Sequence, residues 1–129
     1  VADRRGWPDG ARRAGALPLV TDRPTAAGGG GLGFNGGQLL YLSIAACWSN
    51  DLYREAATMG IELDGVEITV GGDFPARASG STPIVVDVAV GRQTRIRELI
   101  AEVERVAEIP GAIRDATPIE VNASSERPA

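Results

Sequence analysis

The chain has 129 residues, of which 43% are hydrophobic and 23% are charged, and its formal net charge is -4. These values predict one soluble globular domain over residues 1–129, and the acidic balance argues against nucleic-acid binding. The chain contains no histidine, and all thirteen of its basic residues are arginines. This excludes Ser-His-Asp and Cys-His catalysis, histidine-ligated metal sites and lysine Schiff bases.

Cysteine usage narrows the chemistry further, because Cys47 is the sole cysteine. A single thiol excludes an intrachain disulfide framework and any multi-thiolate zinc or iron–sulfur site within one chain, so we expect no metal and no other cofactor. Such usage is typical of a cytoplasmic protein. The longest apolar run, residues 39–48, is about half as long as a bilayer span, so we expect no membrane segment.

The first third of the chain predicts short strands, a glycine-rich loop and the start of a helix. Turn signals flank the apolar stretch 16–20, which predicts one or two short strands within residues 1–27. A glycine-dense segment, residues 28–33, follows. Asn35 has the short acceptor side chain that suits a helix N-cap, so a helix should begin near Gly36.

This helix should run to Met59 and end at Gly60 in the C′ position. Its first half, residues 39–48, is apolar on every face, which predicts burial. From Asp51 onward it becomes amphipathic and should emerge toward solvent.

The remaining residues predict two strands, an amphipathic helix and a last strand. The two strands should pair as an antiparallel hairpin, and Pro110-Gly111 should end the second helix. The predicted ranges are 61–71 and 84–90 for the hairpin strands, 94–108 for the helix and 119–121 for the last strand. The fold class is therefore α+β.

The glycines match a dinucleotide-binding spacing, Gly31-x-Gly33-x-x-Gly36. Two features of that motif are missing, however. No apolar strand leads directly into the glycines, and the acidic residue about twenty positions on, Asp51, lies inside the same helix. We therefore predict a loop at the helix entry and no nucleotide site.

Carboxylates are the other groups that could carry chemistry. Asp51 and Glu55 are spaced i, i+4 on the polar half of the long helix, where a solvated face is expected. The acidic residues of the second helix should likewise form its exposed face, since a metal site would need converging ligands. They are Glu98, Glu102, Glu104 and Glu108.

Cys47 itself has two interpretations. A lone cysteine in an apolar helix is by default a small buried hydrophobe. A reactive thiol would need an electropositive neighbour, which in this chain must be an arginine. The candidates are those of the N-terminal region: Arg4, Arg5, Arg12, Arg13 and Arg23.

Two local patterns carry a family resemblance: Gln38-Leu39-Leu40 leading to Ala45-Ala46-Cys47, and a helix that ends in Met59-Gly60-Ile61. Over about residues 22–122 the chain resembles the OsmC/Ohr family of thiol-dependent hydroperoxide reductases. The resemblance implies an OsmC-like fold, in which antiparallel strands wrap a long buried central helix and two chains form an intertwined homodimer.

The resemblance also assigns roles to residues. It implies that Cys47 attacks the peroxide and becomes a sulfenic acid, and Arg5 is the nearest match for the activating arginine. Two positions depart from the family pattern. Gly37 stands where the family keeps a glutamate, and Ile109 stands where it keeps the cysteine that resolves the sulfenic acid as a disulfide.

Three functional hypotheses follow. The first is a one-cysteine hydroperoxide reductase of the oxidative stress response, with a small-molecule hydroperoxide as substrate and an external thiol as reductant. The second is a non-peroxidatic protein that binds a small hydrophobic ligand near Cys47. The third is an inert dimeric scaffold.

Overall fold

The computed structural model describes residues 2–3, 11–14, 17–77, 80–91 and 94–125. The chain divides into two compact units, residues 1–40 and 41–129. Among the described helices, none has the length and apolar character needed to span a membrane. The expectation of one domain over the whole chain stays a prediction.

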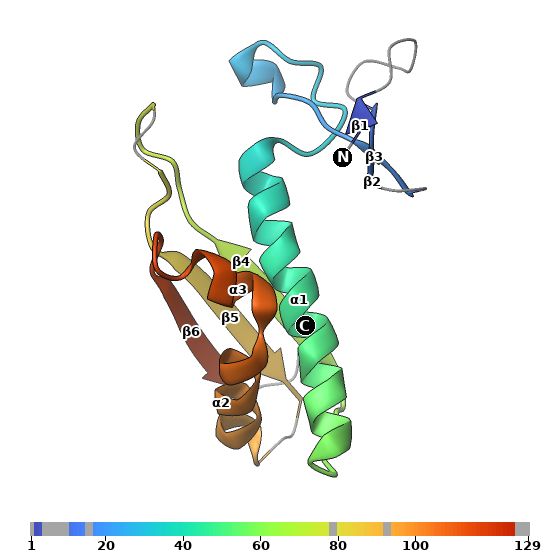
Figure 1. Cartoon of the computed structure of the whole chain (residues 1–129), viewed down its shortest axis with the longest axis vertical. Coiled ribbons are helices and arrows are strands. Elements are labelled where there is room, and N and C mark those ends of the chain that lie inside the picture. The colour runs from blue at the N-terminus through green and yellow to red at the C-terminus, as the bar shows by residue number, and fades with distance from the viewer. Residues whose placement is uncertain (1, 4–10, 15–16, 78–79, 92–93, 126–129) are drawn as a thin grey trace. The chain divides into compact units, whose positions relative to one another are not determined.

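The first unit contains a small antiparallel sheet in the order β1-β2-β3 (Figure 1). Its strands are β1 (Ala2–Asp3), β2 (Ala11–Ala14) and β3 (Leu17–Val20). A 3-10 turn, η1 (Thr25–Ala27), follows, and a single bridge joins Thr21 to Phe34 at the end of the glycine segment. The sequence predicted one or two strands here, and the described residues of this region contain three.

The long helix α1 spans Gly36–Thr58, close to the predicted range. At its start Asn35 Oδ1 accepts from the Gln38 amide and Gln38 Oε1 accepts from the Asn35 amide, both at 2.9 Å. This reciprocal pair is a capping box that satisfies two donors of the helix entry. Gly60 follows the helix at φ 67°, a left-handed conformation that glycine adopts without strain. Both predicted caps are confirmed.

The second unit is built on a three-stranded sheet in the order β4-β5-β6. β4 (Val66–Gly71) and β5 (Ile84–Val90) form the predicted antiparallel hairpin, and β6 (Ile119–Ser124) runs parallel to β5. The first strand begins five residues later than predicted, because Gly65 turns the chain at φ 86° immediately before it.

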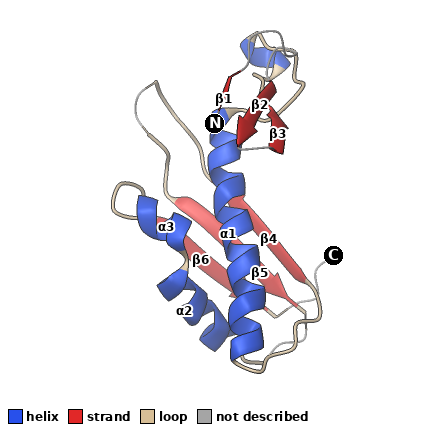
Figure 2. Ribbon diagram, turned by 45° about the vertical axis from the view of Figure 1, so that its right-hand side comes forward, coloured by secondary structure: helices blue, strands red, loops and turns tan. Residues whose placement is uncertain are grey.

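Three helices lie on one face of this sheet: α1, α2 (Ile96–Val106) and α3 (Glu108–Ile113) (Figure 2). The central strand β5 alternates, so that one face is buried while Asp87 on the opposite face is exposed. A strand covered on one side alternates in this way. The core residues are Ile84, Val86, Val88 and Val90 from β5, Ile44, Trp48, Leu52 and Ala56 from α1, and Leu99, Ile100 and Val103 from α2.

Pro110 does not break a helix, contrary to the prediction. The break lies at Ala107, whose extended backbone (φ -63°, ψ 115°) separates α2 from α3. Pro110 is the third residue of α3 and is buried. In the first turn of a helix the backbone N–H has no intrahelical acceptor, so a proline there costs no hydrogen bond.

Burial along α1 follows a stripe, whereas the sequence predicted an all-round buried first half. Ile44, Trp48, Leu52 and Ala56 are almost fully buried, while Leu42 is 45% exposed. The second half, predicted to emerge toward solvent, contributes two residues of this stripe. The described residues of a single chain therefore cover one face of the helix and leave Leu42 partly exposed on another.

Candidate functional site

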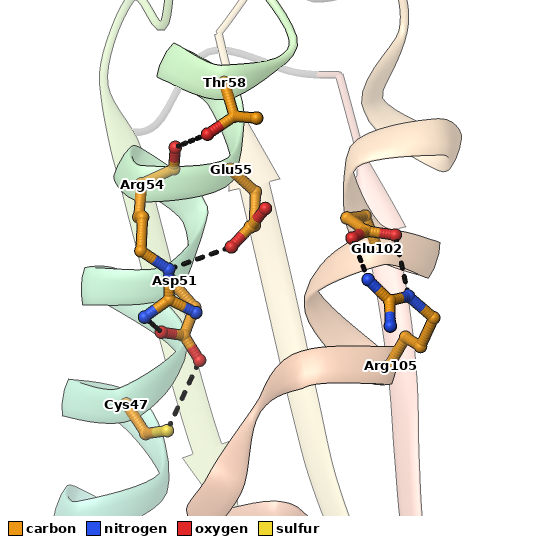
Figure 3. Close-up of polar contacts among 7 residues, drawn as sticks. All are labelled: Cys47, Asp51, Arg54, Glu55, Thr58, Glu102 and Arg105. Atoms are coloured by element: carbon orange, nitrogen blue, oxygen red, sulfur yellow. Dashed lines mark hydrogen bonds and ion pairs between the residues drawn. The ribbon is translucent and has the colours of Figure 1, made fainter.

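Cys47 lies in the middle of α1 and is half-buried. Its thiol donates a hydrogen bond to Asp51 Oδ2, with an Sγ–O distance of 3.6 Å (Figure 3). The two residues are four positions apart, which places them on adjacent turns of the same helix face. Sulfur is a weak donor and its large radius gives long hydrogen bonds, so this contact orients the thiol more than it stabilises the fold.

Asp51 is 5% exposed, although its carboxylate is a charged group. The prediction that Asp51 and Glu55 form a solvated face is wrong: the Glu55 side chain is also mostly buried, at 13% exposure. Both residues flank the buried stripe of α1. Arg54 compensates for the burial, because Nη1 pairs with Asp51 Oδ1 and Nε donates to Glu55 Oε1, each at 2.9 Å. A buried charge is tolerated when it is paired and hydrogen-bonded in this way.

The guanidinium of Arg54 is the positive centre of this cluster. The hydrogen bond to Glu55 raises the pKa of Arg54, and the negative charges of Asp51 and Glu55 raise it further. Arg54 therefore carries its positive charge at neutral pH. Because its side chain is 57% exposed, the cluster borders on solvent at this residue.

The arginines proposed from the sequence as neighbours of Cys47 lie in the first unit. Arg4 and Arg5 fall outside the described residues. Arg12 and Arg13 belong to β2, and Arg23 is exposed. Within the described part of the chain, the polar partner of the Cys47 thiol is Asp51.

The sequence did not single out Asp51 as the partner of Cys47. The i, i+4 spacing from Cys47 was the available signal, because it places a carboxylate one helical turn from the thiol. The polar pattern of this half of the helix instead indicated a solvated face. The residues of that pattern are Asn50, Asp51, Arg54 and Glu55.

The glycine segment binds a side chain of its own chain. Asp22 Oδ2 accepts from the amides of Gly30 and Leu32, at 2.9 and 3.1 Å, and Oδ1 accepts from the Arg23 amide at 2.7 Å. These hydrogen bonds, the one from Leu32 foremost, lower the pKa of Asp22. Amides that already surround a carboxylate are not available to a pyrophosphate. The absence of a nucleotide site stays a prediction.

The same segment borders an open hollow of about 420 Å³. It is lined by Thr21, Asp22, Arg23, Gly28, Gly29, Phe34, Asn35 and Gly36. In the same segment, position 33 needs a glycine for a steric reason, since a Cβ at Gly33 would overlap the Val20 carbonyl oxygen.

The two positions at which the resemblance predicts a departure from the family pattern are both described. Gly37 is the second residue of α1 and Ile109 is the second residue of α3, where its side chain is 40% exposed. Across the described residues no three carboxylate or cysteine side chains converge as a metal site would require. On α2, Glu98 pairs with Arg95 and Glu102 pairs with Arg105.

Comparison with known proteins gives one family. The family model of OsmC-like proteins matches residues 28–122. A search of curated protein sequences finds no significant match.

Several crystal structures share the fold. An OsmC-like protein from Mycoplasma pneumoniae is 18% identical, with a TM-score of 0.79 over 91% of this chain and 88% of that chain. An organic hydroperoxide resistance protein from Legionella pneumophila is 24% identical, with a TM-score of 0.66 over 85% and 83%. One from Bacillus subtilis is also 24% identical, with a TM-score of 0.60 over 88% and 94%. At these identities the similarity concerns the fold.

Proposed function

The chain belongs to the OsmC-like family, and from this premise we propose that it is a one-cysteine, thiol-dependent organic hydroperoxide reductase in which Cys47 is the peroxidatic residue. The observation that carries the proposal is the half-buried Cys47 thiol in the middle of α1, in contact with the buried carboxylate of Asp51. Cys47 is thus not fully buried, and its thiol has a defined polar partner.

The proposed chemistry has two stages. The Cys47 sulfur attacks the distal oxygen of the hydroperoxide, so that an S–O bond forms, the O–O bond breaks, and the products are a sulfenic acid and an alcohol. A small external thiol then condenses with the sulfenic acid, releasing water and leaving a mixed disulfide. A second external thiol attacks this disulfide, restores Cys47 and leaves as an oxidised dimer.

The external reductant is part of the proposal because the chain has no second cysteine. Ile109 stands where a resolving thiol would be, so the sulfenic acid has no partner in its own chain. Arg5 is proposed as the activating arginine, since a guanidinium near the sulfur stabilises the thiolate. The glutamate that would orient it is replaced by Gly37, so Arg5 must be held by other contacts.

We further propose that the working form is a cytoplasmic homodimer, with neither nucleic acid nor membrane among its partners. Support comes from α1, whose first half has apolar residues on every face. Leu42 lies outside the buried stripe of this helix and is 45% exposed. A second copy would cover this surface.

An activity measurement tests the proposal. Wild-type protein should consume an organic hydroperoxide in the presence of a small dithiol, while Cys47→Ser should not, and Arg5→Gln should lower the rate. Equal background consumption by wild type and Cys47→Ser would reject the reductase. The binding of a small hydrophobic ligand, or a scaffold role, would then be the better account.

A further inference from the structure

Asp51 stands out among the described carboxylates because it is both buried and in contact with the sulfur. It is 5% exposed, and its two oxygens have different partners: Oδ1 faces Arg54 and Oδ2 accepts the Cys47 thiol. We propose that Asp51 is the proton acceptor that generates the Cys47 thiolate. This inference rests on the proposed function and names a second residue of the same site.

Charge balance is the first argument. The thiol and the carboxylate together hold one proton and one negative charge, and the guanidinium of Arg54 faces that charge at 2.9 Å. When the proton moves from Sγ to Oδ2, the pair still holds one proton and one negative charge. The thiolate therefore forms without adding net charge to the site. Adding a charge to a mostly buried site would be costly.

Geometry is the second argument. The thiol already donates to Oδ2 across 3.6 Å, so the transfer needs only a short approach of two side chains that face each other. Arg54 Nη1 forms an ion pair with the other carboxylate oxygen, and Arg54 Nε in turn donates a hydrogen bond to Glu55 (Figure 3). The carboxylate is thus fixed in orientation by a chain of contacts along α1.

The proton has a defined destination in the proposed reaction. After transfer, the thiolate attacks the distal oxygen of an organic hydroperoxide, and the O–O bond breaks with its electron pair on the leaving alkoxide oxygen. The protonated Asp51 then gives its proton to that oxygen. The sum is thiol plus hydroperoxide to sulfenic acid plus alcohol, and Asp51 ends as the carboxylate with which it began.

A purely electrostatic role for Asp51 predicts the opposite behaviour. If its negative charge merely opposed the thiolate, a neutral replacement would make Cys47 more nucleophilic. If Asp51 takes the proton, the same replacement makes Cys47 less nucleophilic. The sign of the change therefore separates the two roles.

The experiment measures Cys47 alkylation by iodoacetamide at pH 7 together with oxidation by cumene hydroperoxide, both followed by intact mass. We expect Asp51→Asn to slow alkylation at least tenfold, and Asp51→Glu to restore most of the rate. Glu102→Gln is the matched control, because Glu102 also pairs with an arginine three residues on but belongs to α2 and does not touch the sulfur. It should stay within twofold of wild type.

Equal or faster alkylation of Asp51→Asn would overturn the inference. Should Asp51→Asn fail to fold by circular dichroism, Asp51→Ser carries the same expectation, since its hydroxyl can hydrogen-bond to sulfur but cannot take the proton. The two readouts separate this inference from the proposed function. Slower alkylation of the variant with no oxidation of wild type by the hydroperoxide would keep Asp51 as the base and reject the reductase.

Discussion

The carboxylate of Asp22 accepts a hydrogen bond from the backbone amide of Leu32 at 3.1 Å, which closes the glycine segment onto a side chain of its own chain. This contact, followed by the one from Arg23, is the main reason that the pKa of Asp22 is lowered. In the folded chain the ionised carboxylate is therefore favoured by backbone donors that an unfolded chain does not offer.

The first prediction concerns acid pH. Because the folded pKa of Asp22 lies below its unfolded value of about 3.9, its contribution to stability is present above that value and is lost as pH falls through the folded pKa. A carbon-13 NMR titration of the carboxyl groups should give Asp22 a midpoint below about 3.9. Asp22→Asn identifies the resonance, and a midpoint at or above the unfolded value would contradict the contact.

The second prediction compares two glycines of the apparent nucleotide motif. Gly33→Ala should lower the free energy of unfolding by about 1–3 kcal/mol, because the added Cβ would overlap the Val20 carbonyl. Gly36→Ala is the control: no atom lies within 4 Å of its added Cβ, and at the first position of α1 alanine costs less backbone entropy than glycine. Urea unfolding measures both. Equal losses would refute this steric explanation of the motif.

Nucleotide binding is the subject of the third prediction. Since the amides of Gly30, Leu32 and Arg23 already surround the Asp22 carboxylate, they are not free to hold a pyrophosphate. Titration calorimetry with nicotinamide and adenine nucleotides should show no specific heat of binding. A micromolar dissociation constant for any of them would contradict the assignment of the glycine segment to structure.

The helix boundaries illustrate what local sequence determines. Asn35 and Gly60 mark the ends of α1 because a short acceptor and a left-handed glycine satisfy helix ends with groups close in the chain. The hairpin was predictable for a related reason, since two apolar strand patterns are separated by residues 72–83, a segment with glycines and prolines that favours a loop. The three-stranded order in which β6 lies parallel to β5 depends on contacts distant in sequence, and no local pattern encodes it.

The site was less predictable than the fold. Cys47 could be singled out because it is a lone thiol in an apolar helix. The burial of Asp51 could not, because it depends on packing against the other elements of the second unit and on the pairing of Arg54 with two carboxylates. The role of Pro110 was not predictable either. In the sequence, a proline that ends one helix cannot be distinguished from a proline in the first turn of the next, and only the break at Ala107 shows that Pro110 belongs to α3.

The fourth prediction is the oligomeric state. A homodimer that covers α1 should bury on the order of 2,000 Å² or more and persist at micromolar concentration. Leu42→Asp should weaken it at least tenfold, about 1.4 kcal/mol, because a charge would replace an apolar side chain that is 45% exposed in the single chain. Analytical ultracentrifugation measures both proteins. A folded wild-type monomer at micromolar concentration would remove the dimer from the proposal.

The state of the sulfur after oxidation tests the proposed function most directly. With one cysteine per chain, an oxidised Cys47 must remain a sulfenic acid, be captured by an added thiol, or pass to the sulfinic acid. A disulfide between the Cys47 residues of two chains would need their Cα atoms within about 7 Å.

The measurement is intact-mass spectrometry after one equivalent of an organic hydroperoxide, with and without a small thiol, on wild type and Cys47→Ser. Wild type should gain the mass of one oxygen atom, or that of the added thiol as a mixed disulfide when the thiol is present, and Cys47→Ser should gain neither. Identical masses for the two proteins, with no hydroperoxide consumed in the presence of the thiol, would contradict a peroxidatic role for Cys47.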